Sequence, residues 1–390
     1  MPREAAELVF DEATKVYPGR EGAAVDHLSL TVPAGEICVL VGPSGGGKTT
    51  ALKLVNRLIP LTTGDIRIDD TSILKQDVVQ LRRSIGYVIQ QVGLFPHMTV
   101  EANIGTVPRL YRRPRAWIKD RSAELLELVG LDPSYAKRYP TQLSGGQRQR
   151  VGLARALAAD PPVMLMDEPF GAVDPIVRER LQNEFLRLQE QLAKTILFVT
   201  HDIDEAIKLG DVVAVFRDGG VVEQFAPPAE ILAAPASEFV ARFVGADRGL
   251  KRLSLTRVND VELGQAPTAH PGDDAAEARE RTRRNELPYL LLLDAEERPI
   301  GWVDEARLPA GGQLGERLVG ATSPLLDRRT TLKDALSMLL DADVQIGVVT
   351  DRRGAYRGII TVEQIAGFTR ETAREAQERA GEPEVAEREG

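Results

Sequence analysis

Over the first 245 residues, short apolar runs alternate with segments in which apolar residues recur at helical spacing. Mainly apolar runs occupy positions 37–41, 163–166 and 196–200, and a helical pattern follows each within a few residues. Strands that alternate with helices form a largely parallel sheet, and such sheets bind ligands at the carboxyl ends of their strands. The pattern therefore predicts an α/β domain with its functional site after one or more of these strands.

The pattern changes after residue 245, where two segments resemble each other. Each combines a helical pattern, a strand, a turn and a second strand that leads into a helix. The expected strands are 289–293, 300–303, 346–350 and 358–361. We expect the first repeat to occupy residues 246–310 and the second 318–370. Residues 371–390 are acidic, alanine-rich and nearly free of larger aliphatic side chains, which predicts a fraying helix or a flexible tail.

The composition excludes several classes of protein. The 390 residues include 58 Asp and Glu against 49 Lys and Arg, a formal net charge of −9. Such a chain lacks the global positive field of a nucleic-acid-binding protein, so no nucleic-acid partner is expected. A single cysteine, Cys38, excludes an intrachain disulfide. No apolar run approaches the ~20 residues of a membrane-spanning helix, and acids among the first ten residues argue against a signal peptide.

A glycine-rich segment follows the apolar run at 37–41 and matches the phosphate-binding pattern G-x-x-x-x-G-K-[ST]. Its glycines let the backbone curl so that successive N–H groups face one point, and the following helix adds its dipole to hold an anion. Lys48 is expected to reach the β- and γ-phosphates of a nucleotide, and the Thr49 hydroxyl to coordinate Mg²⁺. The expected nucleotide contacts are Gly42, Pro43, Ser44, Gly45, Gly46, Gly47, Lys48, Thr49 and Thr50.

Two acids end the apolar run at 163–166. A buried strand that leads to adjacent carboxylates needs a cation or another partner for them. Asp167 suits the coordination shell of Mg²⁺, and Glu168 suits a general base for an attacking water. Such a pair alone is more often a solvated loop feature, but together with the phosphate loop it favours a site for a metal and a nucleotide.

Residues 143–147 read Leu-Ser-Gly-Gly-Gln and precede a helical pattern. Ser144 can cap that helix, and the N–H groups of Gly145 and Gly146 can form a second anion site. The spacing alone favours an ordinary helix cap. A function for the Leu-Ser-Gly-Gly-Gln segment can be inferred only from its position along the chain between the phosphate loop and the strand that ends in Asp-Glu.

In this order, the phosphate loop, the Leu-Ser-Gly-Gly-Gln segment and the apolar strand ending in Asp-Glu resemble the ATP-binding-cassette (ABC) ATPases, and the resemblance covers about residues 7–245. It implies that Tyr17 stacks on adenine and that His201 contacts the γ-phosphate. Gln90 resembles the glutamine that touches Mg²⁺ and the attacking water. We choose it over its neighbouring glutamine because the family places this residue four positions before the Leu of Leu-Phe-Pro at 94–96.

The same resemblance implies a homodimer of cassettes, because one chain carries a single set of motifs. In the family, the Leu-Ser-Gly-Gly-Gln of one subunit closes over the nucleotide of the other, and Asp174 resembles the aspartate that faces the dimer partner. The residues implied in the closing contact are Ser144, Gly145, Gly146 and Gln147. ATP and Mg²⁺ are the implied cofactors. The implied catalytic residues are Glu168, His201 and Gln90, and the implied metal ligands are Thr49, Gln90 and Asp167.

A helical subdomain is implied at about residues 91–160, where the family docks an integral membrane permease. Apolar residues at 94–98 suit such a contact, and about half of them suit packing inside the domain. The chain is then expected at the cytoplasmic face of the cell membrane, as a peripheral protein. An extracytoplasmic substrate-binding protein is an indirect partner.

Residues 85–100 and 238–248 are similar to the osmoprotectant branch of bacterial importers, whose ATPases often carry paired cystathionine-β-synthase (CBS) repeats after the cassette. The implied fold is α/β, with a phosphate-loop ABC nucleotide-binding domain over 1–245 and a smaller tandem CBS-like domain after it. The implied function is the ATP-hydrolysing subunit of an importer for glycine betaine, carnitine, choline or proline betaine. The second repeat matches better, but Gln364 stands where many CBS repeats have a ribose-binding acid. A packing or ionic-sensing role is therefore favoured over nucleotide sensing.

Two other functions stay open at this point. An importer ATPase for another substrate, such as an amino acid, would carry the same cassette motifs. A non-transport ABC protein that acts on DNA or ribosomes usually has tandem cassettes or long coiled-coil insertions in one chain, and this sequence has neither.

Overall fold

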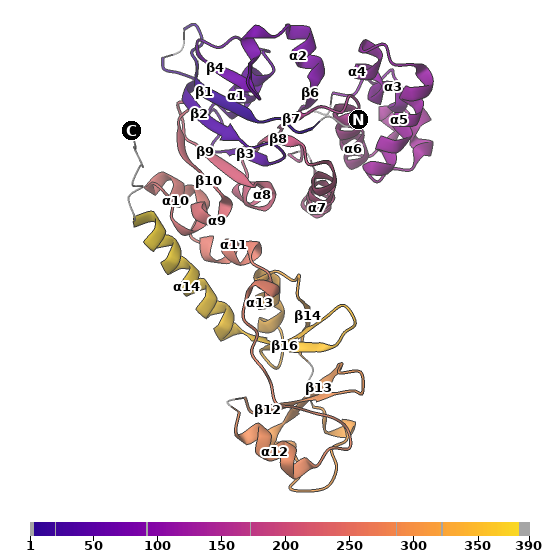
Figure 1. The fold of residues 1–390 in the computed structure, drawn as a ribbon, viewed down its shortest axis with the longest axis vertical. Helices are drawn as coiled ribbons and strands as arrows, with labels where there is room; N and C mark the ends of the chain where they lie inside the picture. The colour runs from indigo at the N-terminus through magenta and orange to yellow at the C-terminus, as the bar shows by residue number, and fades with distance from the viewer. Residues whose placement is uncertain are drawn as a thin grey trace. The chain divides into compact units, whose positions relative to one another are not determined.

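The computed structural model describes residues 4–19, 21–90, 93–171, 173–285, 287–320 and 323–381, with side chains up to residue 371. The chain forms two compact units, Met1–Ile231 with Pro235–Val244, and Leu232–Ala234 with Gly245–Gly390 (Figure 1). Within the described residues, no helix has both the length and the apolar character needed to cross a membrane.

A six-stranded sheet forms the centre of the first unit, in the order β10-β9-β3-β8-β7-β6. The strands are β3 (Ile37–Val41), β6 (Ile85–Val88), β7 (Val163–Asp167), β8 (Thr195–Val199), β9 (Val212–Phe216) and β10 (Val222–Ala226). All neighbours run parallel except β10, which pairs antiparallel with β9. The strands β3, β7, β8 and β9 are buried at every position, as sheets covered on both faces require. The parallel α/β sheet predicted from the apolar runs is confirmed.

A second, antiparallel sheet has the order β2-β1-β4-β5. Its strands are β1 (Leu8–Lys15), β2 (Val25–Val32), β4 (Thr63–Ile68) and β5 (Thr71–Ser72). Helix α1 (Lys48–Val55) shares one apolar core with both sheets, in which Phe10, Leu52 and Phe216 are among the fully or nearly fully buried side chains. This packing fixes α1, and with it the loop that precedes it.

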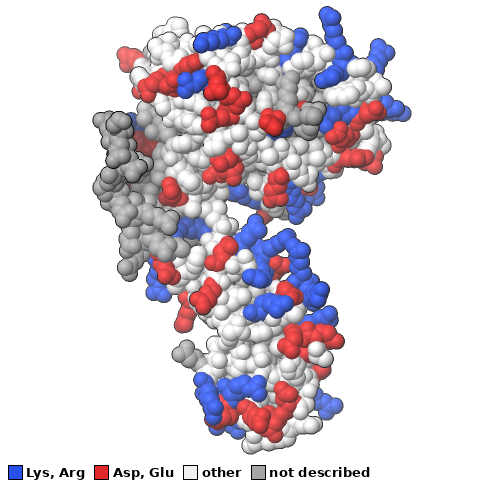
Figure 2. All heavy atoms as spheres, in the orientation of Figure 1, with Lys and Arg blue, Asp and Glu red and all other residues white. Residues whose placement is uncertain are grey.

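Among the described residues between β6 and β7, the regular elements are all helices. They are α3 (Val100–Ile104), α4 (Thr106–Leu110), α5 (Arg115–Leu128), η2 (Pro133–Lys137), η3 (Pro140–Gln142) and α6 (Gly145–Leu157). The remaining helices of the unit are η1 (Ile73–Lys75), α2 (Val78–Ser84), α7 (Pro175–Leu192), α8 (Ile203–Leu209), α9 (Pro228–Ala233) and α10 (Glu238–Val244). Exposed basic side chains gather over α4 and the start of α5 (Figure 2).

The second unit contains the same arrangement twice. Two three-stranded sheets, β11-β12-β13 and β14-β15-β16, each join a parallel pair to an antiparallel hairpin. The strands are β11 (Thr268–Ala269), β12 (Tyr289–Leu293), β13 (Pro299–Asp304), β14 (Leu325–Asp327), β15 (Ile346–Thr350) and β16 (Tyr356–Thr361). The helices are α11 (Arg248–Leu255), η4 (Val258–Asp260), α12 (Ala275–Arg283), η5 (Glu305–Arg307), η6 (Glu316–Leu318), α13 (Leu332–Leu340) and α14 (Val362–Gly381).

The first part of the segment predicted as a fraying helix or a flexible tail is helical. Helix α14 continues to Gly381, and the rest of the segment predicted as a fraying helix or flexible tail, 382–390, lies outside the described residues.

Candidate functional site

The glycine-rich loop joins β3 to α1 and surrounds a cavity of about 280 Å³. The cavity is lined by Ser44, Gly45, Gly47, Lys48, Thr49, Thr50 and Glu168. Two glycines shape the loop: Gly42 has φ 150° and Gly47 has φ 91°, and a Cβ would lie 2.2 Å from the Phe216 carbonyl oxygen at Gly42 and 2.1 Å from that of Ala24 at Gly47. No L side chain fits either position, so the sequence pattern has a direct steric cause.

Replacing Gly47 with alanine should therefore destabilise the fold as well as the loop. A matched control exists in Gly45, which has φ 89° but no atom within 4 Å of the position that a Cβ would occupy. Both alanines incur the left-handed backbone cost of about 1–2 kcal/mol, and only Gly47→Ala adds a clash with backbone. We expect urea unfolding without nucleotide to show a clearly larger loss of stability for Gly47→Ala. Equal losses would contradict the steric explanation.

Lys48 is turned toward the backbone of its own loop. Its Nζ donates hydrogen bonds to the carbonyl oxygens of Gly42, at 2.8 Å, and of Pro43, at 2.7 Å. Burial lowers the pKa of Lys48, and the nearby carboxylates of Glu168, Asp167 and Asp218 oppose that shift. A buried cation held by two neutral acceptors is well placed to bind an anion in the adjoining cavity.

Asp167 is hydrogen-bonded to Thr49, which lines this cavity. The Thr49 Oγ1 donates a hydrogen bond to Asp167 Oδ1 at 3.0 Å, and Asp167 is 8% exposed. Burial raises the pKa of Asp167, and the Thr49 hydrogen bond partly offsets the rise. Mg²⁺ in nucleotide sites is bound by one or two such oxygen ligands together with phosphates and waters. A hydroxyl and a carboxylate beside a phosphate loop fit that ion.

Glu168 is held by two side chains that are distant in sequence. Gln90 Nε2 donates to its Oε2 at 2.9 Å, and His201 Nδ1 lies 3.1 Å from its Oε1. The backbone places the carboxylate there, because Glu168 is the first residue after β7, has φ 44°, and donates its N–H to the Val199 carbonyl at the end of β8. The three side chains come from the ends of three neighbouring strands, β6, β7 and β8. A residue held in the left-handed region at such a place is typical of a functional site.

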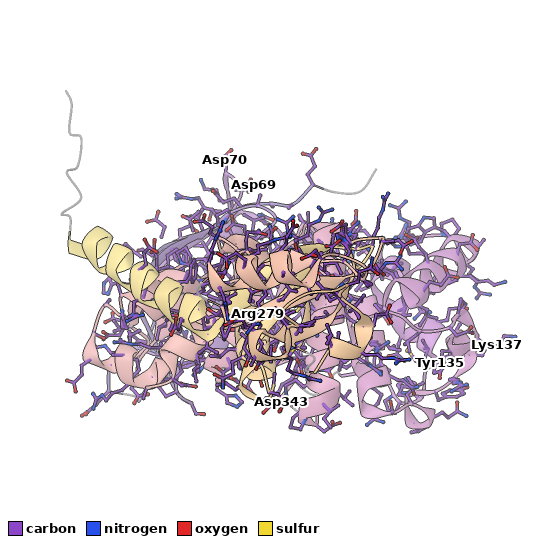
Figure 3. The ribbon with its side chains drawn as sticks, turned by 90° about the horizontal axis from the view of Figure 1, so that it is seen from below. Asp69, Asp70, Tyr135, Lys137, Arg279 and Asp343 are labelled. Carbon is purple, nitrogen blue, oxygen red and sulfur yellow. The ribbon has the colours of Figure 1, made fainter. Side chains whose placement is uncertain are left out.

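The Leu-Ser-Gly-Gly-Gln segment lies on a different cavity. Ser144 Oγ accepts the N–H of Gln147 at 3.3 Å, and Gln147 Oε1 accepts the N–H of Ser144 at 2.9 Å, so the two form a capping box on α6. Gln147 Nε2 also donates to Tyr135 Oη at 3.2 Å; Tyr135, labelled in Figure 3, belongs to η2. Both the expected helix cap and an accessible glycine pair are therefore present.

Asp174 borders the same second cavity, of about 540 Å³, which Ser144, Gly145, Gly146 and Gln147 also line. Its Oδ1 accepts the N–H of Val177 at 3.1 Å and caps α7. The structure thus brings the predicted residues into two groups. Residues of the phosphate loop, with Asp167, Glu168, Gln90 and His201, form one group, and the residues predicted to meet a second copy form the other.

Tyr17 lines neither of these two cavities. It follows β1, is half-buried, and carries the Lys15 ammonium 5.2 Å from its ring centroid. It is not among the residues that line the phosphate-loop cavity. The sequence analysis did not identify the contacts of Tyr135 and Lys15, because a tyrosine in a short 3₁₀ helix and a lysine at a strand end belong to no phosphate-binding motif.

The chain is similar to several known proteins. The family model described as ABC transporter matches residues 25–171. The osmoprotectant import ATP-binding protein OsmV of Salmonella typhimurium is 47% identical over 372 residues, covering 93% of this chain and 96% of OsmV. The glycine betaine/carnitine/choline transport ATP-binding protein OpuCA of Bacillus subtilis is 42% identical, covering 91% of this chain and 94% of OpuCA.

Solved structures resemble part of the chain. A dimeric ATP-binding cassette in a post-hydrolysis state, bound to ADP and Pi, has a TM-score of 0.52 and 34% identity; it covers 57% of this chain and 98% of its own. A subunit of the cbiONQ ABC transporter complex of Clostridium perfringens has a TM-score of 0.55 and 26% identity, covering 60% of this chain and 93% of its own. With such likeness along almost the whole length of its relatives, and with the phosphate loop and its partners assembled, this chain belongs to the ABC transporter family as an ATP-binding subunit.

Proposed function

We propose that this chain is the ATP-hydrolysing subunit of an importer for quaternary-amine compatible solutes. The observation that carries the hydrolytic part is the Glu168 carboxylate, held by Gln90 and His201 beside the phosphate loop. The solute class is supported by relatives whose names specify osmoprotectants, glycine betaine, carnitine and choline, and by their coverage of both units of the chain. One relative named for sulfate and thiosulfate import covers only 67% of this chain.

In the proposed mechanism, ATP binds with its phosphates at the loop and its terminal phosphate near Lys48. The N–H groups of the loop and the Lys48 ammonium stabilise the negative charge, which is the main contribution to phosphoryl transfer. Mg²⁺ would be held by Thr49 and Asp167, with Gln90 close by, and would neutralise charge on the phosphates. Tyr17 is assigned to the adenine by family resemblance.

Glu168 is the proposed general base. Its carboxylate accepts a proton from the attacking water, and Gln90 and His201 orient the carboxylate and the water. Gln90 already donates to one carboxylate oxygen, and His201 lies within hydrogen-bond distance of the other. A base that is preorganised in this way loses little freedom when the nucleotide arrives.

A second copy is proposed to complete the site. Ser144, Gly145, Gly146 and Gln147 would meet the nucleotide of the partner, and Asp174 would face it, because these residues border a cavity apart from the phosphate loop of their own chain. The solved dimeric cassette with ADP and Pi supports such an assembly. Two copies of this chain with one pair of permease subunits form the proposed transporter.

The permease contact is proposed for the helical part of the first unit. Ile89 and Phe95 precede α3 of this part, are 36% and 40% exposed, and are close in sequence to Gln90. Movement at such a contact would reach Glu168 through Gln90. The chain would then work at the cytoplasmic face of the membrane, and an extracytoplasmic binding protein would deliver the solute without touching it.

The second unit is proposed to be a pair of CBS-like repeats, because the same sheet topology occurs twice in succession. It carries none of the residues assigned to ATP, so its proposed role is regulatory or structural. In the second repeat, the position at which an acid would bind a ribose is Gln364, whose Oε1 accepts the Thr361 N–H at 2.9 Å. An amide engaged in this local cap favours a role other than nucleotide binding.

Uptake measurements test the proposed solute. In a bacterial strain without its own compatible-solute importers, the chain expressed with its permease and binding protein should support uptake of labelled glycine betaine. The Glu168→Gln variant should abolish it, and Glu190→Gln, an exposed glutamate on α7, should not. Uptake of an amino acid without uptake of any quaternary amine would favour the alternative importer function.

A further inference from the structure

One arginine, Arg178, contacts two loops. The first loop ends at Asp174, and the second begins at His201. Arg178 lies in the first turn of α7, and its Nη2 donates to the Val173 carbonyl oxygen at 3.1 Å. Its Nη1 lies 3.8 Å from Asp202 Oδ2. A single planar guanidinium therefore contacts the residue before Asp174 and the residue after His201.

Asp202 is fixed by other contacts. Its Oδ1 accepts the N–H of Asp204 at 2.9 Å and of Glu205 at 3.3 Å, and so caps α8. Its own N–H donates to Thr200 Oγ1 at 3.1 Å. The carboxylate cannot turn without losing the cap, and its second oxygen is left to face Arg178. Arg178 therefore faces a carboxylate that is fixed to the backbone next to His201.

A buried hydrogen bond strengthens the same connection one helical turn further along α7. Gln182 Nε2 donates to Glu205 Oε1 at 2.9 Å, and the two residues are 6% and 7% exposed. Burial raises the pKa of Glu205; hydrogen bonds with Thr200 and Gln182 partly offset the rise, and the positive charge of Arg178 adds a smaller lowering effect. Such a bond resists separation, because either group would otherwise be left buried without a hydrogen-bond partner. At two successive turns, helix α7 thus contacts Asp202, next to His201, and Glu205 in α8.

We propose that Arg178 is a positioning residue that couples the Asp174 loop to the His201 loop. When a second copy meets Asp174, the shift of that loop is passed through Arg178 and Asp202 to His201, and so to the Glu168 carboxylate. The Nε of Arg178 is buried without a hydrogen-bond partner among the described residues, which leaves this guanidinium a donor to engage when the loop moves. The inference rests on the proposed ATP hydrolysis and adds the route by which the dimer contact reaches the base.

The first test replaces Arg178 with methionine in the full chain and measures steady-state ATP hydrolysis. The kcat should fall about tenfold to a hundredfold, because a misplaced catalytic group costs that much, while KM for ATP stays within about twofold. Arg178→Lys should restore part of the kcat, since one ammonium can reach one partner but not both. The matched control is Arg187→Met, an exposed arginine on the same helix, which should behave as the wild type.

A second test asks whether Arg178 acts through His201. If it does, the double variant Arg178→Met/His201→Ala should be no slower than His201→Ala alone, within about twofold. Independent, multiplying losses would overturn the proposal, because a purely structural role in α7 predicts them.

A third variant covers failure of Arg178→Met to fold. Asp202→Asn keeps an oxygen to cap α8 but removes the charge that faces Arg178, and should lower kcat in the same way. If the unmodified chain hydrolyses ATP and both Arg178→Met and Asp202→Asn have the same kcat as it does, this inference is wrong and the proposed function still stands. An inactive wild-type chain would overturn the proposed function with it.

Discussion

Glu168→Gln should bind ATP normally and almost cease to hydrolyse it. The amide keeps the size of the side chain and can still pair with Gln90 and His201, but it cannot take a proton from water. Loss of a positioned general base costs about 10²–10⁴-fold in rate. The phosphate loop is untouched, so affinity for ATP should change by less than about threefold, because no charge-assisted contact to the phosphates is removed.

Single-turnover hydrolysis and titration with a fluorescent ATP analogue separate the two effects. Gel filtration with ATP and Mg²⁺ should also show a dimer of the Glu168→Gln variant, because the nucleotide-bound state no longer decays. Glu190→Gln removes an exposed carboxylate from α7 and should match the wild type in all three measurements. Hydrolysis at a near-normal rate in Glu168→Gln would show that another group is the base.

Much of the central sheet could be predicted because its strands are buried on both faces. The apolar runs at 37–41 and 163–166 became β3 and most of β7, and such runs have no polar alternation that could confuse them with surface strands. The antiparallel sheet of β1, β2 and β4 was not predicted, since its strands mix buried and exposed positions. The strands β11 and β14 have two and three residues, too few for any periodicity to identify them.

The functional residues were easier to predict than their contacts. The phosphate loop is a local motif, and its glycines are required by clashes with nearby carbonyl groups. The cluster around Glu168 is not local: Gln90 is 78 positions away and His201 is 33. Only the parallel order β6, β7, β8 brings the ends of these strands together. Arg178 could not be identified from sequence at all, because its importance lies in contacts to a backbone carbonyl and to a helix cap.

The Lys48 ammonium has two alternative sets of acceptors. The phosphate-loop motif predicts that this ammonium reaches phosphates, whereas in this structure it donates to the carbonyl oxygens of Gly42 and Pro43. Both arrangements follow from one requirement, since a buried ammonium needs acceptors. A phosphate oxygen is a stronger acceptor than a carbonyl, because it carries charge. Binding of ATP should therefore draw Lys48 away from its loop.

Lys48→Ala should lose most ATP binding while the fold remains. A hydrogen bond to a charged group contributes about 1.5–3 kcal/mol, which corresponds to a loss of about ten- to hundredfold in affinity. Lys48→Met keeps most of the buried hydrocarbon, so it separates loss of charge from loss of packing, and it should weaken binding to a similar degree. The control Lys75→Ala removes an exposed lysine of the same unit and should leave affinity unchanged. Titration with a fluorescent ATP analogue gives the affinities, and thermal unfolding without nucleotide checks the fold. If Lys48→Met bound ATP as tightly as the wild type, the anion would be held by the N–H groups of the loop alone, and the assigned role of the Lys48 charge would be wrong.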